Sequence, residues 1–65
     1  MSEPEPGTAE ARAEAARLYA EARGFEARHD YHAAREAYAA SLRLQENEAV
    51  LSAYLALMAK IGPAE

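Results

Sequence analysis

Two histidines flank an aspartate near the middle of the chain, at His29, Asp30 and His32. Imidazole and carboxylate groups can bind a metal ion or exchange protons near neutral pH. These three residues straddle the expected start of a helix, so their side chains need not converge, and no further ligand is evident. We interpret the segment as a solvent-exposed turn, and we expect no metal site and no cofactor.

The other groups that could react have no suitable neighbours in the sequence. Ser41 and Ser52 lie in expected helices, with no histidine at a spacing that would activate either as a nucleophile. The 65 residues contain no cysteine, which excludes a thiolate nucleophile, a thiolate metal site and a disulfide within them. Gly24 stands alone and does not form a phosphate-binding loop. We therefore predict that the protein is not an enzyme.

The charge balance limits the classes of partner. Seven basic and eleven acidic residues give a formal net charge of −4, and the sequence pI is about 5.1. A nucleic-acid backbone or an anionic membrane would attract a basic face, so neither is expected as a partner. No apolar run approaches the roughly 18 residues of a spanning helix, and the basic-then-apolar pattern of a signal peptide is missing. We expect a soluble, cytoplasmic protein.

The composition predicts an all-α fold. Alanine, the strongest helix former, is abundant, whereas the β-branched residues are only Thr8, Val50 and Ile61. Apart from Gly24, glycine and proline lie near the two ends of the chain. A single domain of this length buries only about 60% of its unfolded surface, so its own core supplies a thin margin of stability.

Capping residues divide the chain into three expected helices and two tails. Thr8, Asp30 and Asn47 are suitable N-caps, and Gly62 followed by Pro63 is a typical helix end. The acidic, proline-rich residues 1–7 are expected to form a disordered tail. The predicted domain covers residues 8–62, with a short tail at 63–65. The expected helices span residues 9–28, 31–44 and 48–61.

The first two expected helices each have one apolar stripe. In the first helix the stripe follows spacings of four and three residues, which places it on one face. It comprises Ala11, Ala15, Leu18, Ala22 and Phe25. In the second helix it comprises Tyr31, Ala34, Tyr38 and either Ser41 or Leu42. Gly24 interrupts the first helix, where it either permits a close helix crossing or only weakens the helix before the turn.

The segment from His29 to Asn47 resembles the second half of a tetratricopeptide repeat. That half typically has aspartate and tyrosine at its start, then alanine, an aromatic residue and leucine at fixed spacing. The matching residues are Asp30, Tyr31, Ala34, Tyr38 and Leu42. Upstream, large apolar, small and aromatic positions are occupied by Leu18, Ala22 and Phe25. The repeat period is about 34 residues, and the resemblance covers roughly residues 15–48, half of the chain.

The resemblance implies an antiparallel helical hairpin followed by a third helix. Ala22 and Ala34 would allow the two helices to approach closely, with aromatic residues filling the space around them. Three positions depart from the family pattern, because His29 replaces the turn glycine, Glu46 the terminal proline and Glu21 a leucine. Two other interpretations remain open: an alanine-rich three-helix bundle, and a domain of the microtubule-interacting-and-trafficking type, which usually has a longer second helix. The predicted hairpin core is Leu18, Ala22, Phe25, Tyr31, Ala34, Tyr38 and Leu42.

The third expected helix is apolar nearly all round. Alanines fill most of the positions outside its large apolar residues, and within the helix body only Ser52 and Lys60 are polar. Such a helix is normally buried on all sides, yet one hairpin covers a single face of it. An apolar surface that remains exposed usually marks a binding site. The large apolar residues span an arc of roughly 160°, and they are Val50, Leu51, Tyr54, Leu55, Leu57, Met58 and Ile61.

These features predict a protein–protein interaction module, such as an adaptor, a docking domain or a small chaperone-type subunit. The predicted binding residues are the seven of the third helix, together with Tyr19 and Arg23 in the hairpin groove. The clamp of lysine and asparagine that some tetratricopeptide proteins use for acidic C-termini is not carried over, because that face offers Tyr19, Arg23 and Glu26. The expected partner is a second copy in a homodimer, or a helical or peptide segment of another protein. The alternatives are a self-assembling structural subunit with no external client and a microtubule-interacting-and-trafficking-like peptide-binding domain.

Overall fold

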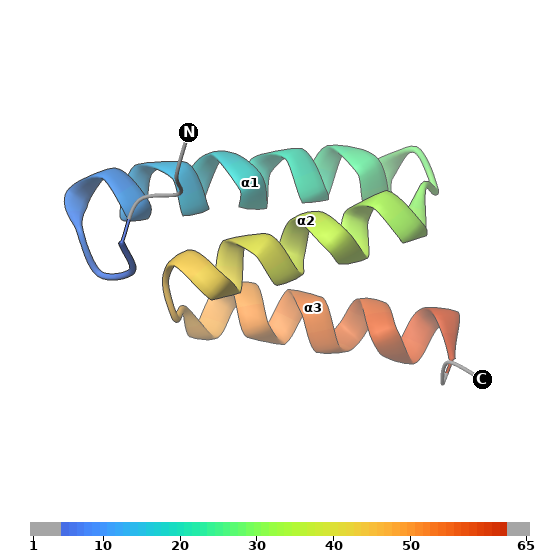
Figure 1. The fold of residues 1–65 in the computed structure, drawn as a ribbon. Helices are drawn as coiled ribbons and strands as arrows, with labels where there is room; N and C mark the ends of the chain where they lie inside the picture. Colours follow the sequence, from blue (N-terminus) through green and yellow to red (C-terminus); the bar gives the residue numbers. More distant parts are fainter. Residues whose placement is uncertain (1–4, 63–65) are drawn as a thin grey trace.

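The computed structural model describes residues 5–62, and within them it contains three helices and no strand (Figure 1). The predicted all-α class and the three-helix architecture are confirmed. The first helix ends one residue earlier than predicted, with Arg28 as its C-cap. The predictions for residues 1–4 and 63–65 lie outside the described residues. The helices are α1 (Ala9–Ala27), α2 (Tyr31–Leu44) and α3 (Glu48–Ile61).

Each helix begins directly after its predicted N-cap residue. The hydroxyl of Thr8 accepts a hydrogen bond from the Ala11 amide at 3.0 Å. The side chain of Asn47 accepts one from the Ala49 amide at 2.8 Å, and Asp30 caps α2 in the same way. These oxygens satisfy amide groups that the first turn of a helix leaves without a partner.

The chain enters α1 through a turn. Residues Glu5–Gly7 lie within the predicted tail, and the Thr8 hydroxyl donates a hydrogen bond to the carbonyl of Glu5 at 2.9 Å. Gly7 has a φ of +88°, a conformation that glycine adopts without steric cost. Thr8 therefore uses its hydroxyl both as a donor to this turn and as the acceptor that caps α1.

The connection between α1 and α2 is a Schellman motif at the C-terminus of α1. The amide of Asp30 donates to the carbonyl of Phe25, and the amide of His29 donates to the carbonyl of Glu26, both at 2.9 Å. This motif requires a left-handed residue, and His29 has a φ of +64°. His29 is therefore strained at the position where the tetratricopeptide pattern has glycine.

The α1–α2 hairpin is antiparallel and is built on small residues. Ala22 of α1 and Ala34 of α2 have no exposed surface. At the other end of the hairpin, Ala11 and Ala15 pack against Leu44 in a second buried cluster. Because alanine has no side chain beyond Cβ, helices that meet at these positions can approach closely.

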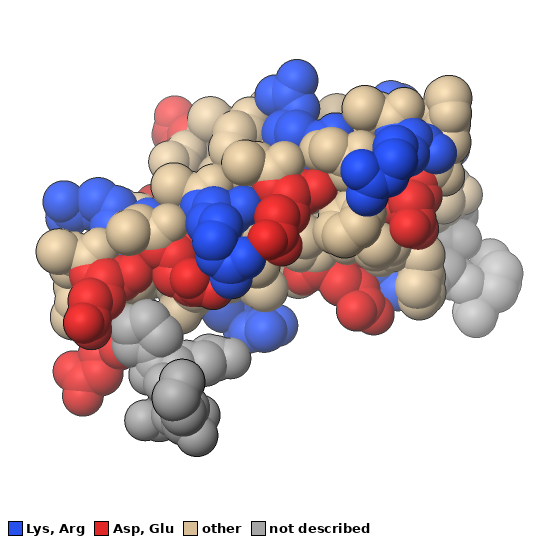
Figure 2. All heavy atoms as spheres, turned by 90° about the horizontal axis from the view of Figure 1, so that it is seen from above, with Lys and Arg blue, Asp and Glu red and all other residues tan. Residues whose placement is uncertain are grey.

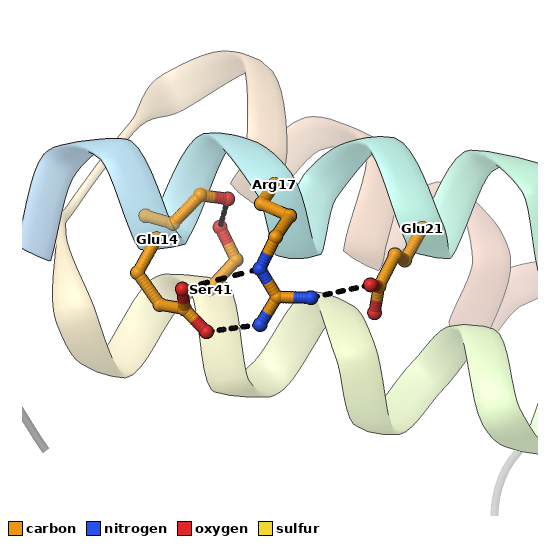
Figure 3. A network of polar contacts seen from close by, with 5 residues as sticks. Glu14, Arg17, Glu21 and Ser41 are labelled. Atoms are coloured by element: carbon orange, nitrogen blue, oxygen red, sulfur yellow. Dashed lines mark hydrogen bonds and ion pairs between the residues drawn. The ribbon is translucent and has the colours of Figure 1, made fainter.

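Ser41 settles one alternative that the sequence left open. It is buried, whereas Leu42 is only partly buried. The Ser41 hydroxyl donates a hydrogen bond to the carbonyl of Ala15 across the hairpin at 2.8 Å (Figure 3). A buried hydroxyl without such a partner would destabilise the fold, so this bond makes the small polar residue compatible with the core.

Gly24 is not required by packing. A Cβ added at this position would meet only the side chain of Arg28, at 4.0 Å. The close approach of α1 and α2 therefore depends on the alanines, and Gly24 does not mark a close helix crossing.

The third helix packs on α2 and only weakly on α1, so the helices follow one another across the molecule (Figure 1). Val50 and Leu57 of α3 join the buried cluster that contains Tyr38 of α2. The main core is therefore a single cluster centred on α2, with α1 on one side and α3 on the other.

Replacing the strained residue of the turn should stabilise the protein. We expect His29→Gly to raise the free energy of unfolding by about 0.5–1 kcal/mol, because glycine adopts a positive φ without the steric cost that histidine bears. Urea unfolding followed by circular dichroism measures the change. His29→Ala is the control, since it keeps the strained conformation and loses the edge-on contact of the His29 ring with Tyr31. A variant His29→Gly that is no more stable than His29→Ala would contradict the assigned turn geometry.

Candidate interaction surface

The large apolar side chains that the described residues expose all belong to α3. The exposed fractions are 45% for Leu51, 57% for Leu55 and 43% for Ile61. Tyr54 and Met58, which lie between them on the helix, are partly exposed. At about 100° per residue these five side chains occupy an arc of roughly 120°. We call this surface the outer face of α3: Leu51, Tyr54, Leu55, Met58 and Ile61.

Two residues of the predicted binding surface belong to the core instead. Val50 is 4% exposed and Leu57 has no exposed surface, because both belong to the buried cluster that contains Tyr38. A partner could reach them only if α3 separated from α2. The prediction for these two residues is therefore corrected, and α2 covers the edge of the apolar arc on which they lie.

The two binding residues predicted on α1 line a different surface. Tyr19 and Arg23 face a groove between α1 and α3, which contains hollows of about 250 Å³ beside Tyr19 and about 400 Å³ beside Arg23. The Arg23 guanidinium donates a hydrogen bond to the Tyr19 hydroxyl at 3.1 Å and lies over its ring. The structure thus brings these two residues together but places them apart from the outer face of α3.

Within the predicted hairpin core, burial is uneven. Three residues have no exposed surface, namely Ala22, Ala34 and Tyr38. Three are partly buried against that cluster, namely Phe25, Tyr31 and Leu42. Leu18 is partly buried against the second cluster. The aromatic and leucine side chains therefore cover the alanine contact and remain partly open to solvent.

A polar group links all three helices beside the core. The Tyr38 hydroxyl donates a hydrogen bond to one carboxylate oxygen of Glu26 at 2.8 Å, and the Lys60 ammonium donates to the other at 3.1 Å. Lys60 also lies over the ring of Tyr31. This link was not predicted from the sequence, although Glu26 and Lys60 are separated by 34 residues, the period of the repeat pattern.

This contact shifts the pKa values of both acidic groups. Burial, together with the hydrogen bond to Glu26, raises the pKa of Tyr38 to about 12. The hydrogen bonds from Tyr38 and then from Lys60 lower the pKa of Glu26. Both shifts favour an ionised Glu26 and a neutral Tyr38 near neutral pH.

The outer surface of α1 is charged. Arg17 pairs with Glu14 and Glu21 along one side of the helix (Figure 3). Basic and acidic side chains are interleaved over the face of the molecule that α1 forms (Figure 2). Exposed pairs of this kind contribute little to stability, but they keep the surface hydrated. The molecule is therefore charged along α1 and apolar along the outer face of α3.

The segment from His29 to His32 does not assemble a site. His29, Asp30 and His32 are all exposed, and Asp30 uses its carboxylate to cap α2. His32 lies 3.9 Å from the exposed carboxylate of Glu36, one turn along the same helix. Across residues 5–62, no three side chains of metal-binding type come close enough to hold an ion. In the same part of the chain, no helix combines the length and hydropathy needed to cross a membrane.

The contact at Glu26 should make the stability depend on pH in acid. Because the pKa of Glu26 is lower in the folded chain than in the unfolded chain, its contribution is present above the ordinary glutamate pKa. That contribution is lost as the pH falls through the folded value. We expect the free energy of unfolding to decrease between pH 7 and about pH 3, and Glu26→Gln to make the decrease smaller. Urea unfolding at several pH values measures this, with the exposed Glu21→Gln as control. Equal slopes for the two variants would show that Glu26 is not the coupled group.

The chain matches no protein-family model, no curated protein and no solved structure. The resemblance of the hairpin to a tetratricopeptide repeat therefore stays a prediction. The features from which function can be inferred are the outer face of α3, the groove beside Tyr19 and the charged surface of α1.

Proposed function

We propose that this protein is a non-enzymatic protein-binding module, of the adaptor, docking or small chaperone-subunit type, that binds its partner through the outer face of α3. One observation supports this most directly: the large apolar side chains exposed by the described residues all lie on this face. Soluble proteins that act alone rarely leave such a surface uncovered, and exposed apolar patches commonly mark interaction sites.

The spacing of the exposed residues suits a helical partner. Leu51, Leu55 and Met58 follow one another at intervals of four and three residues, so they form a stripe along α3. Helices recognise one another through side chains at this spacing, with the ridge of one helix packed into the groove of the other. The partner surface is therefore an amphipathic helix that presents its own apolar stripe.

The tetratricopeptide-like hairpin is part of the proposal. In stacked helical repeats each unit buries its apolar surface against the next unit, and a terminal unit without a polar cap remains incomplete. Here α3 packs on α2 as a following helix would in such a stack, while Leu51, Leu55 and Ile61 of its outer face remain exposed within residues 5–62. A helix from another chain would take the place of the missing neighbour.

Site-specific photo-crosslinking in the native host tests this function. We expect a chain with the photoreactive residue p-benzoylphenylalanine at Leu55 to give one discrete protein adduct, because this side chain is the most exposed of the outer face of α3. The matched control carries the same residue at Ala20, which is exposed on α1. Mass spectrometry identifies the adduct. No discrete adduct at position 55, or the same adducts at both positions, would refute binding through this face.

A further inference from the structure

We propose that the partner that covers the outer face of α3 is a second copy of this chain, in a two-fold symmetric dimer with the two α3 helices antiparallel. This inference rests on the proposed function, and it adds the identity and orientation of the partner. It follows from the distribution of charge around the apolar face.

One end of this surface is acidic. A hollow of about 510 Å³ opens where α2 turns into α3, and its walls include Leu42, Leu51 and the exposed carboxylates of Glu46 and Glu48. Neither carboxylate has an ion-pair partner within residues 5–62. The apolar face thus begins beside two acidic groups that are available to a partner.

Farther along the same surface, α2 carries a basic group. Lys60 lies over the ring of Tyr31, which shows that the end of α3 runs beside the beginning of α2. Arg35 follows Tyr31 by four residues and precedes Tyr38 by three, so it shares the side of α2 that packs near α3. Arg35 is half-buried and makes no ion pair within the described residues.

A two-fold axis makes this surface complementary to itself. With the axis between Leu51 and Leu55, each of these leucines packs against the other one in the partner subunit. Because the helices are antiparallel, Arg35 then lies near Glu48 of the partner subunit, and the same ion pair forms twice. In an isologous contact every favourable pair occurs twice, which is one reason why closed dimers are the commonest assembly.

The opposite edge of the molecule argues against a head-to-tail chain. Such a chain would place the outer face of α3 on the exposed side of α1 in the next copy. That side carries the ion pairs of Arg17 with Glu14 and Glu21, and the charges over α1 are interleaved (Figure 2). Covering these charges with leucines would remove them from water without compensation. The closed dimer leaves them in solvent.

Exchange of the two charges tests the arrangement. We expect Arg35→Glu and Glu48→Lys each to weaken self-association at least about tenfold, because each places like charges together at both symmetric contacts. An equimolar mixture of the two variants should recover association as a one-to-one heterodimer, since both contacts then pair opposite charges. Sedimentation velocity of the single variants and of the mixture measures this. Each chain of the mixture carries only one substitution, so recovery of association requires the ion pair to form between two chains.

Arg43→Glu is the matched control, because it makes the same charge change at an exposed position of α2. Circular dichroism checks that each variant is folded. If the mixture fails to associate while the parent protein dimerises, the antiparallel arrangement is wrong. A parent protein that is a folded monomer up to about 1 mM would refute the second copy as partner. In that case a crosslinked adduct with a different protein at position 55 would leave the proposed function intact. The absence of any adduct would refute both the proposed function and the proposed dimer.

Discussion

The close contact between α1 and α2 at alanine residues determines the rest of the structure. Ala22 and Ala34 are buried without any exposed surface, so the two helices meet with almost no side chain between them. Such a contact encloses little apolar volume, and among residues 5–62 the largest fully buried side chains are Tyr38 and Leu57. The hydrophobic effect scales with the apolar area removed from water, so a hairpin of this kind gains most from what packs beside it. Helix α3 supplies that surface through Val50 and Leu57.

The same constraint explains both the polar link and the exposed face. Tyr38 is buried in the core, and its hydroxyl donates a hydrogen bond to Glu26, whose carboxylate also accepts one from Lys60. The carboxylate of Glu26 thereby links α1 to both α2 and α3. Because α2 can cover only one side of α3, the remaining leucines face outward. The stability of the molecule and the exposed apolar face of α3 therefore have the same origin.

The local features of the fold could be predicted from the sequence, because they depend on residues close together in the chain. The caps at Thr8, Asp30 and Asn47 set the helix starts, and alternating spacings of four and three set the buried stripe of α1. The prediction was wrong for Val50 and Leu57, because a helix that is apolar nearly all round does not reveal which of its sides α2 will cover. The hydrogen bond from the Ser41 hydroxyl to the Ala15 carbonyl also could not be predicted from the sequence, because it depends on how closely α1 and α2 pack.

If a second copy of this chain covers the outer face of α3, as proposed, the melting temperature of the purified protein must depend on its concentration. Association that occurs only in the folded state stabilises that state by mass action. The melting temperature of the protein should therefore rise by several degrees when its concentration is increased about a hundredfold, and it should stay constant for Leu55→Asp. A melting temperature of the parent protein that is high and independent of concentration would contradict the claim.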